Sequence, residues 1–228
     1  MFGKYDRLIP TPKDKQGCKY VCFTDDPSLK SDFWEIRLVD NDFKSDVHAN
    51  RYYKMHPHVI FPDNELSVYV DANVRVKRSI ADLIHQSLSD TLIAFPKHEH
   101  RDCLYLESEV CVEKKNIPLD IVNAQMKRYR TEGFPSNFGL GEMNIIVRKH
   151  NEPEIVQLME SWWHTFNSGA QRDQLSFFYL IWKLEINFMY LPVETRKMNK
   201  FFFIELHNNS TPWQRVKRSI KRIFSYTV

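Results

Sequence analysis

Two oxygen-bearing side chains, Asp71 and Asn73, follow directly after an apolar, β-branched run at residues 66–70. Val68 and Val70 alternate with other side chains in this run, which is typical of a β-strand. Oxygen donors at positions i and i+2 can face the same way at a strand end. Hard divalent cations bind such oxygens, so the pattern predicts a metal site in the loop. A plain turn is the open alternative, because Asp and Asn are also common turn residues after strands.

Two further polar segments, at residues 51–58 and 97–102, gather cationic and imidazole side chains. The side chains that stand out as candidate ligand contacts are Lys54, His58, His98 and Arg101. Lysine and arginine bind phosphate oxygens through charge-assisted hydrogen bonds. A solvent-exposed position is the competing interpretation for both segments, because exposed cations and polar loops are common.

A glycine-rich loop at residues 132–142 precedes a predicted strand, and residues 171–176 open a predicted helix. The glycines allow the backbone to approach a ligand closely, but no Gly-Lys-Ser/Thr ending marks a phosphate loop. Arg172, Asp173 and Gln174 stand where the helix begins and are candidate catalytic residues. A structural role for Asp173 stays open, because the helix dipole alone favours an acid in a first turn.

Predicted strands and helices alternate along the chain. The strands lie at residues 19–24, 34–39, 66–70, 92–95 and 143–148, and the helices at residues 50–58, 79–87, 117–132, 153–166 and 173–183. This alternation predicts an α/β fold with a mostly parallel central sheet flanked by helices. Ligands bind at the carboxyl ends of strands in such sheets, and Asp71 and Asn73 stand at one of these ends.

The composition is that of a globular protein. The chain has 228 residues, of which 43% are hydrophobic and 14% aromatic, enough for one substantial domain. No run of about 18 apolar residues predicts a transmembrane helix, and no apolar signal region opens the sequence. We therefore expect a cytoplasmic protein with reduced thiols, whose four scattered cysteines lack zinc-ligand spacing. A net charge of +3 is too small to indicate a nucleic-acid partner.

The C-terminal segment, residues 209–228, differs from the rest. Between residues 213 and 224 it carries five Lys or Arg and no acid. The apolar residues that share one face of the predicted helix are Trp213, Val216, Ile220 and Ile223. A basic amphipathic helix can lie on an anionic membrane surface, which predicts a peripheral position on the inner face of a membrane. Packing of the same face on the domain is the alternative.

A series of motifs runs in order through residues 2–185, and the most specific is Arg172-Asp173-Gln174-Leu175-Ser176-Phe177. The others are Phe2-Gly3-Lys4-Tyr5-Asp6, Cys22-Phe23-Thr24-Asp25, Lys54-x-x-Pro57-His58-x-x-Phe61-Pro62, Tyr69-Val70-Asp71-Ala72-Asn73, His98-x-x-Arg101-x-Cys103-x-Tyr105-x-Glu107, Glu132-Gly133-Phe134-Pro135 and Glu142-x-Asn144-x-x-x-Arg148-x-His150-Asn151. In this order they resemble a family that was long filed as a domain of unknown function. That family is now grouped with the GT-A-type glycosyltransferases.

The resemblance implies a GT-A-like, Rossmann-like domain over residues 1–208. Such a domain would move a sugar from a UDP- or GDP-linked donor to a glycan, lipid-linked or protein-linked acceptor. It would hold Mn²⁺ or Mg²⁺ through Asp71, Asn73 and His207. Asn73 departs from the Asp-x-Asp pattern of the family and removes one anionic ligand, and His207 favours Mn²⁺ over Mg²⁺.

The resemblance also implies roles for the other candidates. Lys54, His98 and Arg101 would contact the donor phosphates. Asp173 would be the general base in an inverting reaction, or would bind sugar or stabilise developing positive charge in a retaining one. Thr24 and Asp25 would contact the base or ribose, and His58 would contact the donor. Arg172 and Gln174 would act beside Asp173.

Three other functions compete with sugar transfer. A catalytically weak nucleotide-sugar or glycan-binding module on the same fold would explain Asn73. A metal-dependent hydrolase or nuclease generally needs more clustered carboxylates than this strand end carries. A basic adaptor for membranes or nucleic acid would be built around residues 215–222.

Overall fold

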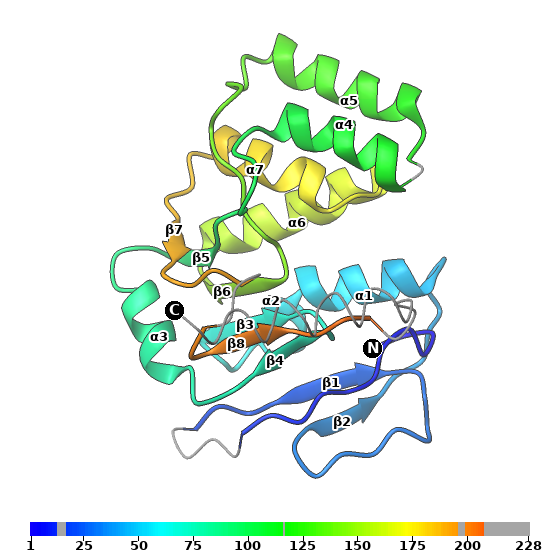
Figure 1. Ribbon diagram of the computed structural model, residues 1–228, viewed down its shortest axis with the longest axis vertical. Coiled ribbons are helices and arrows are strands. Elements are labelled where there is room, and N and C mark those ends of the chain that lie inside the picture. Colours follow the sequence, from blue (N-terminus) through cyan, green and yellow to red (C-terminus); the bar gives the residue numbers. More distant parts are fainter. Residues whose placement is uncertain (13–16, 116, 196–198, 208–228) are drawn as a thin grey trace, which may run out of the picture. The chain divides into compact units, whose positions relative to one another are not determined.

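The computed structural model describes residues 1–12, 17–115, 117–195 and 199–207. This part of the chain forms two compact units, each assembled from segments that are distant in the sequence (Figure 1). Unit 1 consists of Met1–Asn50, Val70–Asp82 and the described residues from Val193 onward, and unit 2 consists of Arg51–Tyr69 and Leu83–Pro192. No helix among the described residues is long and apolar enough to span a bilayer.

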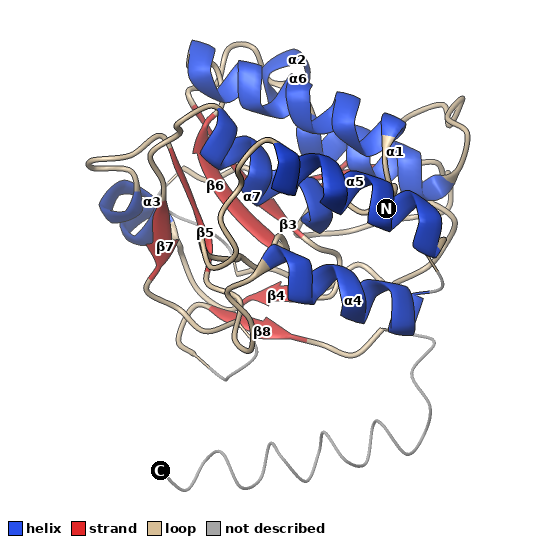
Figure 2. Cartoon of the chain, turned by 90° about the horizontal axis from the view of Figure 1, so that it is seen from above, coloured by secondary structure: helices blue, strands red, loops and turns tan. Residues whose placement is uncertain are grey.

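A four-stranded sheet in unit 2 has the strand order β3-β6-β5-β7, which can be followed in Figure 2. The strands are β3 (Leu66–Val70), β6 (Ile145–Lys149), β5 (Ile93–Pro96) and β7 (Met189–Leu191). β7 runs parallel to β5, whereas β6 runs antiparallel to it. The α/β fold class is therefore confirmed, and the sheet is mixed. Nearly every residue of β5 and β6 is buried, as expected of apolar strands covered on both faces.

Helices form the rest of unit 2. They are α2 (Pro57–Ile60), α4 (Leu104–Lys115), α5 (Leu119–Thr131), α6 (Pro153–Ser168) and α7 (Gln174–Lys183). Proline stands at the first position of α6, where its missing N–H leaves no bond unmade. Gly133 ends α5 with a φ of +88°, a conformation that glycine adopts without strain. α1 (Asp46–Met55) and α3 (Ala81–Ser87) each begin in unit 1 and end in unit 2.

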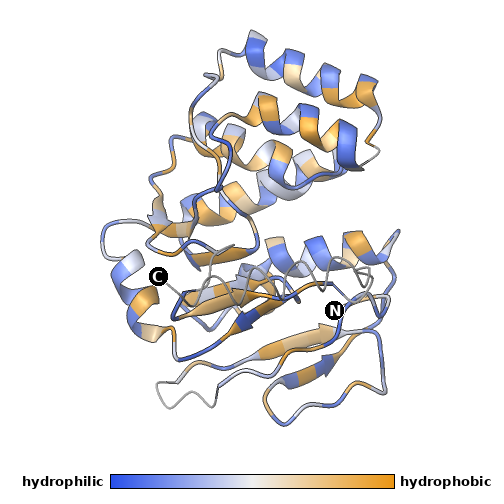
Figure 3. Cartoon of the chain, in the orientation of Figure 1, coloured by the Kyte–Doolittle hydropathy of each residue, from blue (hydrophilic) through white to orange (hydrophobic). Residues whose placement is uncertain are grey.

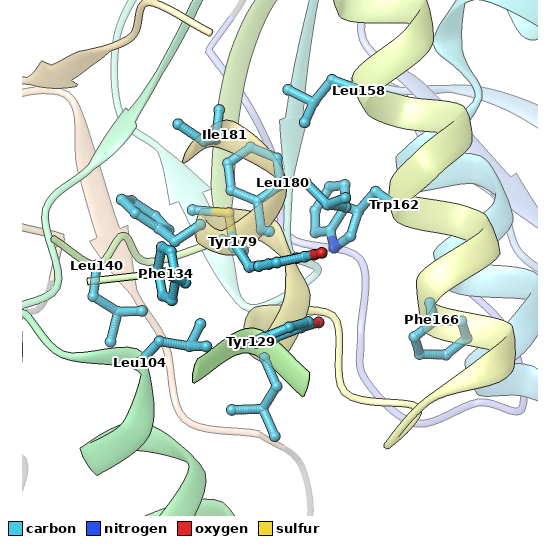
Figure 4. Close-up of a cluster of buried hydrophobic side chains, with 14 of the residues drawn as sticks. Leu104, Tyr129, Phe134, Leu140, Leu158, Trp162, Phe166, Tyr179, Leu180 and Ile181 are labelled. Atoms are coloured by element: carbon cyan, nitrogen blue, oxygen red, sulfur yellow. The ribbon is translucent and has the colours of Figure 1, made fainter. Parts of the chain in front are cut away.

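The hydrophobic core of unit 2 is rich in aromatic side chains, several of which are labelled in Figure 4. Tyr129 of α5 and Tyr179 of α7 stack with ring centroids 3.6 Å apart. Phe95 of β5 is completely buried and has edge-to-face contacts with Phe177 and Phe178 of α7. Aromatic pairs contribute stability beyond the area they bury, so these contacts hold the helices against the sheet.

Unit 1 contains two small sheets. β1 (Val21–Thr24) pairs in parallel with β2 (Glu35–Leu38), and β4 (Val74–Val76) pairs antiparallel with β8 (Phe202–Ile204). β1 is predominantly hydrophobic (Figure 3). The register of the second pair sets Val74 opposite Ile204. It therefore places the residues before β4 beside the residues after β8.

Most predicted elements are present with shifted ends. The helix predicted at residues 50–58 is instead α1 and α2, because Pro57 cannot continue α1 and starts a new turn at His56. Four elements were not predicted from the sequence, namely α4 and the strands β4, β7 and β8. α4 has little amphipathic contrast, and the three strands are only three residues long. The predicted helix within residues 209–228 lies outside the described part of the chain.

Phe95→Ala should destabilise unit 2 by about 3–5 kcal/mol, because it removes a buried ring from a close-packed aromatic cluster. The measurement is equilibrium urea unfolding followed by tryptophan fluorescence. Leu106→Ala is the control, since Leu106 is 50% exposed and its truncation should change stability by no more than about 0.5 kcal/mol. Equal losses in the two variants would contradict this account of the core.

Candidate functional site

The turn after β3 carries Asp71 and Asn73 in unit 1. The backbone N–H of Val74 donates to the Asp71 carbonyl over 2.8 Å, which closes the turn. The N–H of Glu205 donates to the Asn73 carbonyl over 2.7 Å, so the segment after β8 is bound to the same turn. The predicted strand end before Asp71 is therefore confirmed, and a turn follows it.

His207 completes this turn. Its Nδ1 lies 2.7 Å from Oδ2 of Asp6, a carboxylate that can only accept, so Nδ1 carries the proton. Its Nε2 then presents a lone pair, toward which the Asn73 amide nitrogen points over 3.3 Å. The same amide donates to the Glu205 carbonyl over 3.2 Å. Asn73 and His207 are thus brought together, and the Tyr5 ring lies 5.3 Å from the imidazole.

The donor chemistry of this turn fits a hard or borderline divalent cation. The His207 tautomer leaves Nε2 available as a ligand, and a carboxylate behind a metal-binding imidazole is the usual orienting partner. Asp71 supplies a carboxylate and Asn73 an amide oxygen. Within the described residues no group of three His, Cys, Asp or Glu is arranged to hold a metal. A cation here would depend on the amide of Asn73 as a ligand.

Glu205 stabilises the segment bound to this turn through contacts with two arginines. Its carboxylate accepts from Arg7 Nη2 over 2.9 Å and from Arg75 Nε over 2.7 Å. Burial alone would raise the pKa of Glu205, but the two guanidinium groups outweigh it and hold the pKa below its usual value. Glu205 therefore stays ionised and ties β4 to the segment after β8.

Thr24 and Asp25 stabilise a loop of unit 1. Thr24 is buried, and its hydroxyl accepts the backbone N–H of Asp26 over 3.1 Å. Asp25 accepts from the Asn41 amide over 3.1 Å, and the same amide reaches Asp46 over 2.9 Å. Both residues stand at the carboxyl end of β1, as predicted, and their observed contacts hold the local backbone.

The second group of candidates is centred on Asp173 in unit 2, which is 3% exposed. Its Oδ2 lies 2.6 Å from Lys54 Nζ and 3.1 Å from Arg51 Nε, and its Oδ1 lies 3.9 Å from Arg172 Nη1. Burial would raise the pKa of Asp173, but Arg51, Lys54 and Arg172 outweigh it and lower the pKa far below its usual range. Asp173 is therefore ionised at neutral pH and faces three cations.

Several elements hold this carboxylate in place. Asp173 stands at the N-cap of α7 but makes no side-chain cap hydrogen bond. Its carbonyl accepts from Trp162 Nε1 of α6 over 2.8 Å. Lys54 reaches it from α1, with Nζ 5.0 Å from the centroid of the Tyr69 ring. Arg148 of β6 donates to the Lys54 carbonyl over 2.7 Å. The carboxylate is thus turned away from the helix end toward the cations.

His98 and Arg101 form a separate cluster with two acids. His98 Nδ1 accepts the backbone N–H of His100 over 3.2 Å and that of Arg101 over 3.0 Å, and Arg101 Nη2 lies 3.3 Å from His98 Nε2. His98 Nε2 is 3.8 Å from Glu107 and 3.9 Å from Glu142. Arg101 Nε donates to Glu107. The two predicted residues are brought together, and Glu107 and Glu142 lie beside them.

Gln174 connects the glycine-rich loop to the Asp173 group. Its amide donates to the Gly141 carbonyl over 3.2 Å and its oxygen accepts from Arg172 over 3.3 Å. A Cβ at Gly141 would lie 2.7 Å from the Phe95 ring, so only glycine allows this close approach. His58, by contrast, pairs with Glu160 of α6 at 2.8 Å.

The fold is that of an α/β domain, and a family model identifies it as glycosyltransferase-like. The chain belongs to the TOD1/MUCI70 family, because the model of the TOD1/MUCI70 glycosyltransferase-like domain matches residues 13–207. No curated protein and no solved structure matches the chain. The family resemblance inferred from the motifs is therefore confirmed, and it indicates a role in glycosyl transfer at the general level.

Sequence reasoning gave no role to several residues that organise these sites. Asp6 orients His207, Glu107 and Glu142 lie beside His98, and Arg148 donates to the Lys54 carbonyl. Each stands inside one of the motifs that carry the family resemblance. In the sequence each of them is a polar residue within an otherwise apolar or glycine-rich motif. That pattern does not show which residue it contacts in the fold.

Asp173→Asn should lower the stability of unit 2 by about 3–5 kcal/mol at pH 7, because it leaves buried cations without their counter-ion. The native pKa is depressed, so the carboxylate contributes its full stability above the unfolded-state pKa of about 3.9 and loses it as pH falls below that value. The difference in unfolding free energy between wild type and variant should therefore become smaller in acid. Urea unfolding between neutral pH and pH of about 3 measures this.

Glu160→Gln is the matched control. It also converts a carboxylate to an amide in unit 2, but its side chain is 51% exposed beside His58. Its effect should stay below about 1 kcal/mol. If Asp173→Asn loses no more stability than this control, the Asp173 carboxylate is not needed to hold the surrounding cations.

Proposed function

We propose that the protein is a metal-dependent glycosyltransferase that uses a UDP- or GDP-linked sugar. The acceptor would be a glycan, a lipid-linked sugar or a protein. Membership of the TOD1/MUCI70 family supports the transfer of a sugar. The observation that carries the metal dependence is the orientation of His207, whose Nε2 lone pair is held beside Asn73 by the Asp6 carboxylate.

Asp71, Asn73 and His207 would hold Mn²⁺ or Mg²⁺. When bound, such an ion neutralises the diphosphate and makes it a better leaving group. Around it the chain's own residues would bind and orient the donor. Thr24 and Asp25 stand at the carboxyl end of β1, where α/β proteins bind nucleotides.

In unit 2 the cluster of His98, Arg101, Glu107 and Glu142 offers both donors and acceptors. Such a mixture suits the hydroxyl groups of a sugar, as well as the phosphate contacts implied for His98 and Arg101. Two backbone N–H groups donate to His98 Nδ1 and fix the orientation of the ring in this cluster.

We assign Asp173 to positioning and charge stabilisation, and not to proton abstraction. A general base works best with a pKa near the operating pH. The lowered pKa of Asp173, held by Lys54 and Arg51, makes its carboxylate a poor proton acceptor. An ionised, preorganised carboxylate is suited to orienting cations and to stabilising positive charge that develops on a sugar.

A nucleotide-sugar or glycan-binding module without turnover is the second candidate. The observation that favours it is Asn73, whose amide replaces an anionic ligand and is already bonded to Glu205 and His207. Binding of a nucleotide sugar without metal-stimulated hydrolysis or transfer would identify the module.

Thermal unfolding with UDP, GDP and their sugars, with Mn²⁺ or EDTA, tests the transferase. A ligand at 100 times its dissociation constant stabilises the protein by about 2.7 kcal/mol. One nucleotide should raise the melting temperature only with Mn²⁺, and Asp71→Ala should lose both this shift and sugar turnover. Asp42→Ala, an exposed acid of the same unit, should retain both. Full turnover in Asp71→Ala would refute the metal assignment.

Asn73→Asp should make the stability of unit 1 depend on metal. The substitution replaces an amide that donates to Glu205 and His207, and each lost hydrogen bond costs about 0.5–1.5 kcal/mol. Mn²⁺ should restore that loss, because the added carboxylate is a better ligand than an amide. Calorimetric melting with EDTA and with Mn²⁺ measures the difference. Asn64→Asp, at an exposed position, is the control, and identical Mn²⁺ responses in both variants would contradict the proposal.

A further inference from the structure

Two side chains that directly follow β6 hold the loop between α2 and β3. His150 Nε2 lies 2.9 Å from the Phe61 carbonyl, which can only accept, so Nε2 carries the proton. The amide nitrogen of Asn151 donates to the Pro62 carbonyl over 2.8 Å and to the Asn64 carbonyl over 2.9 Å. We call these three hydrogen bonds the loop clamp. Because the loop leads directly into β3, the clamp also positions the start of that strand.

The loop clamp requires His150 in its neutral form. The residue is completely buried, and its Nδ1 has no hydrogen-bond partner among the described residues. Because Nε2 already carries a proton, a second proton would be taken up at Nδ1. It would create a buried N–H without an acceptor, on a ring that has also become charged. Both changes are unfavourable inside a protein and favourable in water.

A buried positive charge close to His150 opposes its protonation as well. Arg148 of β6 is 1% exposed, and its guanidinium donates to the Lys54 carbonyl, the Ser67 hydroxyl and the Met159 sulfur. None of these three partners carries a negative charge. Burial lowers the pKa of Arg148 to about 9, which leaves the guanidinium charged at neutral pH. A protonated His150 would therefore add a second positive charge to this part of the interior.

The other titratable groups around His150 are two histidines and an acid. Glu160 of α6 lies 2.8 Å from His58 Nε2 and 3.8 Å from His56 Nε2, and its side chain is 51% exposed. This carboxylate therefore faces His56 and His58. The charged groups that act on His150 are both basic. Burial lowers the pKa of His150, its hydrogen bond to the loop raises it, and Arg148 and His58 lower it further.

We propose that the loop clamp is an acid-sensitive switch, in which protonation of His150 at Nδ1 drives its ring toward solvent and releases the loop between α2 and β3. Leaving the interior gives the charged ring water as a hydrogen-bond partner and breaks its bond to Phe61. Because β3 ends directly before Asp71, the switch acts on the strand that leads to the candidate metal turn. The clamp uses residues of unit 2 only and needs neither metal nor sugar.

Two measurements on the full chain without ligand test the switch. Proton NMR follows the ring C–H resonance of His150, whose pKa should lie below the unfolded-state value of about 6.5. A lowered pKa means that the stability contributed by the neutral ring is complete above about pH 6.5 and is lost as the pH falls below it. Hydrogen exchange of residues 61–64, corrected for intrinsic rates, should therefore become about three- to tenfold faster between about pH 7.5 and about pH 5.5.

His150→Gln removes the titration but keeps an amide that can donate to the Phe61 carbonyl, so its loop exchange should lose the acid response. His164→Gln, at an exposed position of α6 in the same unit, is the matched control and should respond to acid as wild type does.

Three results would each overturn the proposal. They are a pKa of His150 at or above about 6.5, loop exchange that acid does not accelerate, and an equal acid response in His150→Gln and wild type. If His150→Gln does not fold, the pKa and the loop exchange of the wild-type chain decide. None of these measurements involves a donor or a metal, so a failure of the switch and a failure of the transferase assignment are distinguishable.

Discussion

The buried ion pair between Lys54 and Asp173 is the interaction on which the polar interior of unit 2 depends. It joins residues 119 positions apart, at the end of α1 and the start of α7. Removing two charges from water is costly, and the pair is tolerable only because other groups complete it. Trp162 binds the Asp173 carbonyl and Arg148 binds the Lys54 carbonyl. One network therefore specifies the mutual positions of α1, α6, α7 and β6.

The parts of the fold that the sequence predicted are those set by local patterns. Alternating or continuous apolar runs indicated β1, β3, β5 and β6, and apolar residues at helical spacing indicated α5, α6 and α7. The strand end bearing Asp71 and Asn73 followed from the same local signals. Elements without such a signal were missed. β4 and β8 are too short for a period to appear, and each is a strand only because it pairs with the other.

The roles of charged residues depend on partners that no local pattern reveals. Asp173 is an acid at the start of a helix, and its dipole position was visible in the sequence. The lowered pKa of Asp173 was not visible in the sequence, because Arg51 and Lys54 belong to a helix more than a hundred residues away along the chain. The orientation of His207 likewise depends on Asp6, at the opposite end of the domain sequence. Sequence therefore identified the candidate residues, and tertiary contacts decided which could exchange a proton.

Asn73 illustrates how one side-chain atom sets the character of a site. Its amide donates to the Glu205 carbonyl and points toward the lone pair on His207 Nε2, two acceptors that an aspartate would repel. The turn is therefore ordered by hydrogen bonds before any cation arrives. An acid at this position would bind a cation more strongly but would need that cation, or a protonated histidine, to hold the same arrangement. The asparagine therefore gives a turn that is organised in advance by its own hydrogen bonds, with one anionic oxygen fewer than an aspartate would supply.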